Sequence, residues 1–265
     1  MTDILKAVIL GILEGITEFL PISSTGHLII ANQFISFKED FTVMFDVVIQ
    51  LGAILSVIIY FRKEIIPVNF NYKKNERVFN IWFRAVAGVI PALFLGYIFG
   101  DFMEEKLFNP VVVSTMLVIG GIALILIDRG QRKVKFDDVA TMDYKTVILI
   151  GFIQTLAMIP GTSRSAATII GAMLLGANRK TAAEFSFYLA IPTMVAASGY
   201  SLLKHHAGLT STDLAVLATG FVVSFIVALL VIAFLMNFIR KHTFQSFGYY
   251  RIILGVAILV WLYAI

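Results

Sequence analysis

Side chains that could do chemistry cluster near the N-terminus, in the stretch EGITEFLPISSTGH at residues 14–27. Glu14 and Glu18 are four residues apart, which puts both carboxylates on one face of a helix. Such a pair can serve as a general acid and base or can hold a divalent cation. The structural alternative is that both carboxylates end a helix and face water.

Three hydroxyls follow at Ser23, Ser24 and Thr25, where a second helix is expected to begin. One hydroxyl is enough to cap a helix, and the amides exposed at a helix start bind anions. If the helix begins near Ser23, Ser24 and His27 share one face, and a hydroxyl beside an imidazole is the arrangement of an activated nucleophile. We therefore expect Ser24 to be a nucleophile with His27 as its base.

A second polar segment, PGTSRS at residues 160–165, interrupts another apolar stretch. Arg164 stands between two serines and has no acidic neighbour in sequence, so burial would require an anionic partner. That partner is either a glutamate, Glu14 or Glu18, or a bound phosphate. An arginine and the amides of a helix start together make a clamp for phosphate oxygens.

The composition places these groups in a membrane. Of the 265 residues, 59% are hydrophobic and only 14% are charged, with a mean hydropathy of +0.90, whereas soluble domains carry about a quarter charged residues. The net charge of +4 lies mainly in short loops and is not typical of a nucleic-acid-binding protein. No cysteine is present, which excludes disulfides and thiolate chemistry. Asp3 argues against a signal peptide. No soluble-looking segment is long enough to make a second domain, so we expect one membrane domain over residues 1–265.

The apolar runs predict two kinds of helix. Polar stretches 14–27 and 160–165 are flanked by arms of about 10 residues, each about 15 Å long and about half the thickness of the hydrocarbon core. We expect an all-α integral membrane protein with six transmembrane helices and two re-entrant helical hairpins. The arms are 4–13, 28–35, 146–159 and 166–175, and the spans are 43–61, 82–99, 111–127, 185–203, 214–236 and 248–264.

The two halves of the chain have the same layout, with Pro21 matching Pro160 and Ser24 matching Ser163. Three spans separate the hairpins, and an odd number inverts the second copy. We expect an inverted-topology repeat, of about residues 1–127 and 144–265, whose hairpin tips meet near the midplane.

Basic residues predict the orientation. The loops at 62–77 and 129–145 each carry five Lys or Arg residues, which is typical of the cytoplasmic side. The first hairpin then enters from the other side, so the active site should open extracytoplasmically. Gln154 is expected to contact a site residue or another helix, and Arg251 is expected to extend to the membrane surface.

Together, EGxTEFLPxSSTGH and PGxSRS resemble the motifs of the bacterial undecaprenyl-diphosphate phosphatase family, which is linked to bacitracin resistance. The resemblance covers nearly the whole chain; one departure is Ala166, where the family has glycine. It implies a multi-pass protein of the bacterial cytoplasmic membrane that cuts the terminal phosphate from a polyprenyl diphosphate lipid and recycles the carrier of peptidoglycan and wall polymers. It also implies dependence on Mg²⁺ or Ca²⁺, with Glu14 and Glu18 as candidate ligands.

The resemblance also assigns the site residues. The catalytic set is Ser24, His27, Glu14 and Glu18, and the diphosphate-binding set is Ser23, Thr25, Gly26, Ser163, Arg164, Ser165 and Thr168. Ser24 is the leading nucleophile, and direct attack by His27 or by an activated water are the alternatives. A secondary transporter or lipid flippase for a polyprenyl phosphate is the alternative function, because inverted repeats with discontinuous helices are transporter architecture. Partners beyond the substrate and membrane lipids, including a second copy in a homodimer, are left open.

Overall fold

Helices dominate this fold because a chain in lipid must satisfy its backbone polar groups within each segment. The computed structural model describes residues 1–68, 71–130, 133–204 and 209–264, and the statements below concern those residues. Six helices are long and apolar enough to cross a membrane, which confirms the six predicted spans. They are α3 (Glu39–Tyr60), α5 (Glu76–Leu107), α6 (Pro110–Arg129), α9 (Arg179–Lys204), α10 (Ser211–Phe238) and α11 (Gln245–Ala264).

Two pairs of shorter helices carry the polar stretches. The first pair is α1 (Asp3–Thr17) and α2 (Ser24–Ala31), and the second is α7 (Tyr144–Gln154) and α8 (Arg164–Leu174). The first arm was predicted to end at residue 13, but α1 continues for one more turn because Glu14 and Thr17 are buried rather than solvated. The remaining elements are short: α4 (Arg62–Ile65) and the 3₁₀ turns η1 (Tyr72–Lys74), η2 (Val139–Thr141) and η3 (Thr155–Met158).

The turns that open α2 and α8 have the same backbone geometry. Ser23 and Ser163 cap these helices with positive φ angles of 75° and 72°, a backbone region that residues other than glycine rarely adopt. Each serine accepts a hydrogen bond from the amide three residues later, at 3.2 Å. Ser23 therefore corresponds to Ser163, and the predicted match of Ser24 with Ser163 was wrong by one residue. In this register Ser24 corresponds to Arg164.

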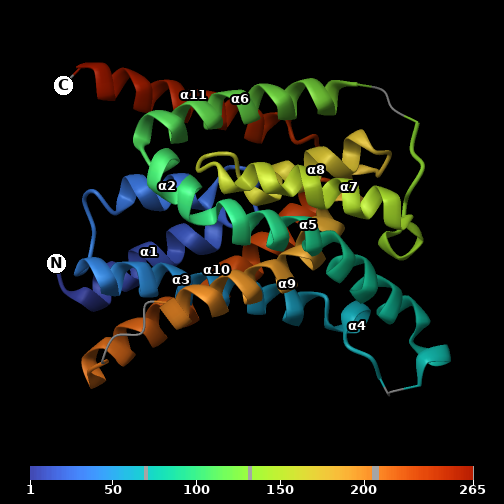
Figure 1. Ribbon diagram of the computed structural model, residues 1–265, viewed down its shortest axis with the longest axis horizontal. Helices are drawn as coiled ribbons and strands as arrows, with labels where there is room; N and C mark the ends of the chain where they lie inside the picture. The colour runs from blue at the N-terminus through green and yellow to red at the C-terminus, as the bar shows by residue number, and fades with distance from the viewer. Residues whose placement is uncertain (69–70, 131–132, 205–208, 265) are drawn as a thin grey trace.

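The long helices hold the two turns between them. Figure 1 shows α6 and α11 side by side along one edge, with α1, α3 and α10 packed together on the other side and α2 and α8 between these groups. The close packing depends on glycines, since a Cβ atom on Gly121 of α6 would lie 2.7 Å from the carbonyl oxygen of Gly248 on α11. At the centre, Phe19 packs edge-to-face on Phe187 with ring centroids 5.3 Å apart.

Candidate active site between the two turns

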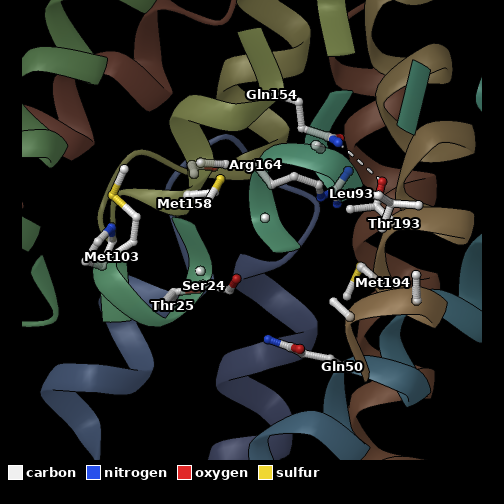
Figure 2. Close-up of a pocket in the computed structure, with 18 of the residues that line it drawn as sticks. Ser24, Thr25, Gln50, Leu93, Met103, Gln154, Met158, Arg164, Thr193 and Met194 are labelled. Carbon is white, nitrogen blue, oxygen red and sulfur yellow. Dashed lines mark hydrogen bonds between the residues drawn. The ribbon is translucent and has the colours of Figure 1, made fainter. Parts of the chain in front are cut away.

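A cavity of about 590 Å³ lies between the two turns. We call it the central cavity. Its polar wall comes from the turns and from facing helices, and its apolar wall comes mainly from α5 and α9 (Figure 2). The polar lining residues are Glu18, Ser23, Ser24, Thr25, Gln50, Gln154, Ser163, Arg164 and Thr193.

Three of these residues form a hydrogen-bonded chain across the two turns. The Ser24 hydroxyl donates to Oε2 of Glu18, and Oε1 of Glu18 accepts from Nη2 of Arg164 at 3.1 Å. Arg164 also donates from Nη1 to the carbonyl oxygen of Ser186 at 2.9 Å. The salt bridge confirms that Arg164 has a glutamate partner, and it connects residues 146 positions apart. A carboxylate that already accepts from a hydroxyl is placed to take its proton.

Two N–H groups of Arg164 make these hydrogen bonds, which leaves other donors of the guanidinium unused. Its Nε is buried and has no hydrogen-bond partner within the described residues, although the residue lines the central cavity. The first amides of α2 and α8 also lack partners within their own helices, as at any helix start. The central cavity therefore brings an arginine N–H and two helix starts to a place where phosphate oxygens can bind.

The hydroxyls of Ser165 and Thr168 form hydrogen bonds with other parts of the protein. Ser165 donates to the carbonyl oxygen of Leu20 at 3.0 Å, which joins the second turn to the first. The Thr168 hydroxyl lies 2.7 Å from that of Ser186, on α9. Neither residue is among those that line the central cavity, and the same holds for Gly26, in the described part of the chain. The structure thus places these three predicted substrate contacts behind the cavity wall.

His27 lies away from the Ser24 hydroxyl. Its Nδ1 is 2.7 Å from the carbonyl oxygen of Ser23, and its Nε2 is 2.7 Å from the hydroxyl of Tyr250 on α11, whose ring stacks on the imidazole. Spacing placed Ser24 and His27 on one face of α2, but Ser24 turns to α1 and His27 turns to α11. The predicted Ser24–His27 contact is therefore replaced by the Ser24–Glu18 hydrogen bond.

Glu14 lies one helical turn before Glu18 and is fully buried. Neither of its carboxylate oxygens accepts a hydrogen bond from the described residues, but its side chain lies within hydrogen-bond reach of the Glu18 carboxyl group, and Asp46 and Arg164 also act on its charge. No group of three or more His, Asp or Glu residues that could hold a metal is formed within the described residues. The donor set fits Mg²⁺, which is commonly held by one or two carboxylates and completed by substrate phosphates and water.

Gln154 is a cavity residue to which the sequence assigned only a supporting role. Thr193 donates to the carbonyl oxygen of Leu189 at 2.7 Å and accepts from Nε2 of Gln154 at 3.3 Å. This orientation leaves Oε1 of Gln154 buried and without a partner in the described part of the chain. The register that the structure gives for the two turns aligns Gln154 with Glu14, and residue types alone did not indicate this register.

The prediction that Arg251 extends to the membrane surface was also wrong. The side chain is instead fully buried and donates to five backbone carbonyls. The reason is that α11 packs against α6 over much of its length, so this face of α11 is turned away from lipid.

Six helices long and apolar enough to cross a membrane indicate a multi-pass membrane protein, and its central cavity is lined by the buried Ser24 and Glu18 and the partly buried Arg164. The chain belongs to the family described as bacitracin resistance protein BacA, whose model matches residues 7–257. It is similar to the undecaprenyl-diphosphatase of Enterococcus faecalis, with 45% identity over 97% of this chain and 96% of the relative. An undecaprenyl-diphosphatase of Lactobacillus delbrueckii subsp. bulgaricus is 48% identical over 98% of both chains. These matches confirm the resemblance that the motifs suggested.

Proposed function

We infer that this chain is an undecaprenyl-diphosphate phosphatase, which converts undecaprenyl diphosphate to undecaprenyl phosphate and inorganic phosphate. The reaction recycles the lipid carrier that peptidoglycan and wall polymer synthesis consume. The observation that carries this inference is the chain from Ser24 through Glu18 to Arg164 at the wall of the central cavity. Relatives that bear this activity in their names match 97% and 99% of this chain.

In the proposed mechanism, Ser24 attacks the terminal phosphorus of the substrate. Its proton passes to Glu18, the bond from phosphorus to the bridging oxygen breaks, and undecaprenyl phosphate leaves. Glu18 then gives this proton to the departing lipid phosphate and is again a carboxylate. Water attacks the phosphoserine, and Glu18 takes a proton from the water and passes it to the Ser24 oxygen as the bond from phosphorus to that oxygen breaks. Inorganic phosphate is released and Ser24 regains its hydroxyl. Direct attack by water, with Glu18 as its base, is the alternative.

The site would bind the diphosphate through charge and oriented amides. Arg164, which lines the cavity, and the first amides of α2 and α8 would supply donors to phosphate oxygens. Ser23, Thr25 and Ser163 also line the cavity and lie beside those amides. In the transition state charge develops on the phosphate oxygens, and donors fixed in advance stabilise it most effectively.

A divalent cation, Mg²⁺ or Ca²⁺, is proposed as the cofactor, with Glu14 and Glu18 as its candidate protein ligands. When bound, the cation neutralises charge on the phosphate oxygens. Glu18 lines the central cavity, whereas Glu14 lies one helical turn before it, is fully buried and is not among the lining residues. The two carboxylate oxygens of Glu14 accept no hydrogen bond from the described residues. Glu18 already accepts from both Ser24 and Arg164.

The apolar wall of the cavity would receive the isoprenoid tail. Gly96 and Gly100 lie one turn apart on α5, and a Cβ atom added at either position would meet nothing within 4 Å. Tyr97, Met194 and Tyr200 line the same side. A polar end between the turns and an apolar end between α5 and α9 match an amphipathic lipid diphosphate.

We also propose that α1–α2 and α7–α8 are re-entrant hairpins of an inverted-topology repeat. The matching positive-φ serines, Ser23 and Ser163, and helices of 8 to 15 residues support this arrangement. The basic loops support a location in the bacterial cytoplasmic membrane with the cavity open to the extracytoplasmic side. The residues assigned to the site all belong to one chain, so the proposal does not require a homodimer.

Release of inorganic phosphate from undecaprenyl diphosphate by the purified protein in detergent tests this function. We expect multiple turnovers that stop when Mg²⁺ and Ca²⁺ are chelated. A lipid flippase without phosphatase activity releases no phosphate, so that result would overturn the proposal. Transport of a polyprenyl phosphate in reconstituted vesicles, without hydrolysis, would instead support the transporter.

A further inference from the structure

Arg251 on α11 is a buried cation with no carboxylate partner within the described residues. Removing a charge from water costs several kcal/mol unless other groups compensate it. Five backbone carbonyl oxygens do so here, all within ordinary hydrogen-bond distance. They belong to Pro21 at 3.2 Å, Met116 at 3.1 Å, Leu117 at 3.3 Å, Gly161 at 3.0 Å and Thr162 at 2.9 Å.

These carbonyls come from three separate parts of the chain. Pro21 belongs to the turn before α2, Gly161 and Thr162 belong to the turn before α8, and the other two lie on α6. One guanidinium therefore connects both turns of the candidate site to the α6–α11 pair. The next residue back along α11, Tyr250, contacts His27 of α2, so α11 holds the first turn at two points.

Fixing a carbonyl also fixes the amide across the same peptide bond, because a trans peptide is planar and its N–H points opposite to its C=O. The Thr162 carbonyl faces Arg251, so the amide of Ser163 points away from Arg251. Ser163 and Gly161 both line the central cavity. Arg251 thus sets the direction of a backbone donor at the start of α8, where the phosphate is expected.

The neighbouring backbone leaves space for this side chain. A Cβ atom on Gly120 of α6 would lie 2.2 Å from Nη2 of Arg251 and 2.9 Å from Cζ. Any larger residue at position 120 would displace the guanidinium without removing its charge. Gly120 therefore offers a way to disturb the contacts of Arg251 while keeping the arginine.

We propose that Arg251 is a positioning residue of the phosphatase site, which holds the two turns at the separation that the diphosphate requires. It touches no reacting atom and acts through the carbonyls of Pro21, Gly161 and Thr162. This inference rests on the proposed function, since it assigns a role within the same site. The structural alternative is that Arg251 only stabilises the fold.

The test compares Arg251→Lys, Arg251→Gln and Gly120→Ala with the wild type and with Arg129→Lys, a control at an exposed arginine beside α11. Thermal unfolding and gel filtration select folded protein, and kcat and KM for undecaprenyl diphosphate are then measured. Misplacing reacting groups by about 1 Å can cost about 100-fold in rate, so we expect kcat to fall by about that factor in Arg251→Gln and less in Arg251→Lys. KM should change little, and Gly120→Ala should resemble Arg251→Lys.

Hydrogen exchange provides a readout that does not depend on activity. Amides in residues 22–26 and 161–166 should exchange faster in the Arg251 and Gly120 variants, whereas those of α3 and α10 should not. Folded Arg251→Gln with wild-type kcat and unchanged exchange in both turns would overturn the inference. If the Arg251 variants fail to fold, Gly120→Ala decides by the same criteria. A wild-type protein that releases no phosphate would refute the proposed function. Hydrogen exchange at the two turns would still test whether Arg251 holds them in place.

Discussion

The Ser24 hydroxyl donates a hydrogen bond to the Glu18 carboxylate, and both side chains are buried at the wall of the central cavity. The other oxygen of Glu18 is held by Arg164, so this carboxylate is fixed in place and its proton-accepting oxygen faces the serine. This relationship supports the proposal that Glu18, on the same polar stretch as Ser24, is the base, while His27 contacts Tyr250 instead.

Glu18→Gln should remove the base and keep the shape of the side chain. General base catalysis contributes about 100- to 10,000-fold, and we expect kcat for undecaprenyl diphosphate to fall within that range in steady-state phosphate release. Glu64→Gln, at an exposed residue of α4, is the matched control and should keep wild-type kcat. A Glu18→Gln enzyme with normal turnover would show that another group takes the proton.

His27→Gln should weaken the enzyme less than any change at Ser24 or Glu18. The substitution loses the contact with Tyr250, and one neutral hydrogen bond is worth about 1 kcal/mol, or about fivefold in rate if all of it is used in the transition state. Tyr250→Phe removes the same contact from the other side and should give a similar loss. Activity that disappears in His27→Gln but survives in Tyr250→Phe would restore His27 as a catalytic base or nucleophile.

Arg164→Lys should lose the fork that now reaches both Glu18 and the Ser186 carbonyl. A lysine presents a single ammonium group and cannot hold this carboxylate, this carbonyl and a phosphate in one plane. Hydrogen bonds to charged groups are worth about 1.5–3 kcal/mol, so kcat/KM should fall by about 10- to 100-fold. Full activity of Arg164→Lys, measured beside Arg129→Lys, would rule out the proposed clamp.

Glu14→Gln should weaken the response to divalent cations. The change removes the charge from the carboxylate whose two oxygens accept no hydrogen bond from the described residues. Two readouts apply: the Mg²⁺ or Ca²⁺ concentration for half-maximal phosphate release, and the shift in thermal unfolding on adding the cation to chelator-treated protein. In Glu14→Gln the half-maximal cation concentration should rise, and the shift in thermal unfolding should require a higher cation concentration. Both readouts should be unchanged in Glu64→Gln. An identical cation response in Glu14→Gln would exclude Glu14 as a ligand.

The sequence predicted the features that follow from burial in lipid. Apolar runs of sufficient length located all six long helices. The isolated charge of Arg164 predicted an anionic partner, because an unpaired cation at that depth is costly, and that partner is Glu18.

The rest depends on contacts that no spacing encodes. Helical periodicity places Ser24 and His27 on one face but does not say that α1 lies on one side of α2 and α11 on the other. The partners of Arg251 are carbonyl oxygens, which every residue carries, so no side-chain pattern reveals them. The register of the two turns follows from φ angles at Ser23 and Ser163, which residue types alone did not indicate.

The most direct test of the account is whether Ser24 carries the phosphoryl group. Undecaprenyl diphosphate labelled in its terminal phosphate is mixed with the wild type and with Ser24→Ala. Each reaction is quenched in denaturant at neutral pH, and the labelled peptides are sequenced. We predict label on Ser24 in the wild type, and neither label nor phosphate release in Ser24→Ala. Phosphate release by Ser24→Ala at the wild-type rate, or label on His27, would contradict the account.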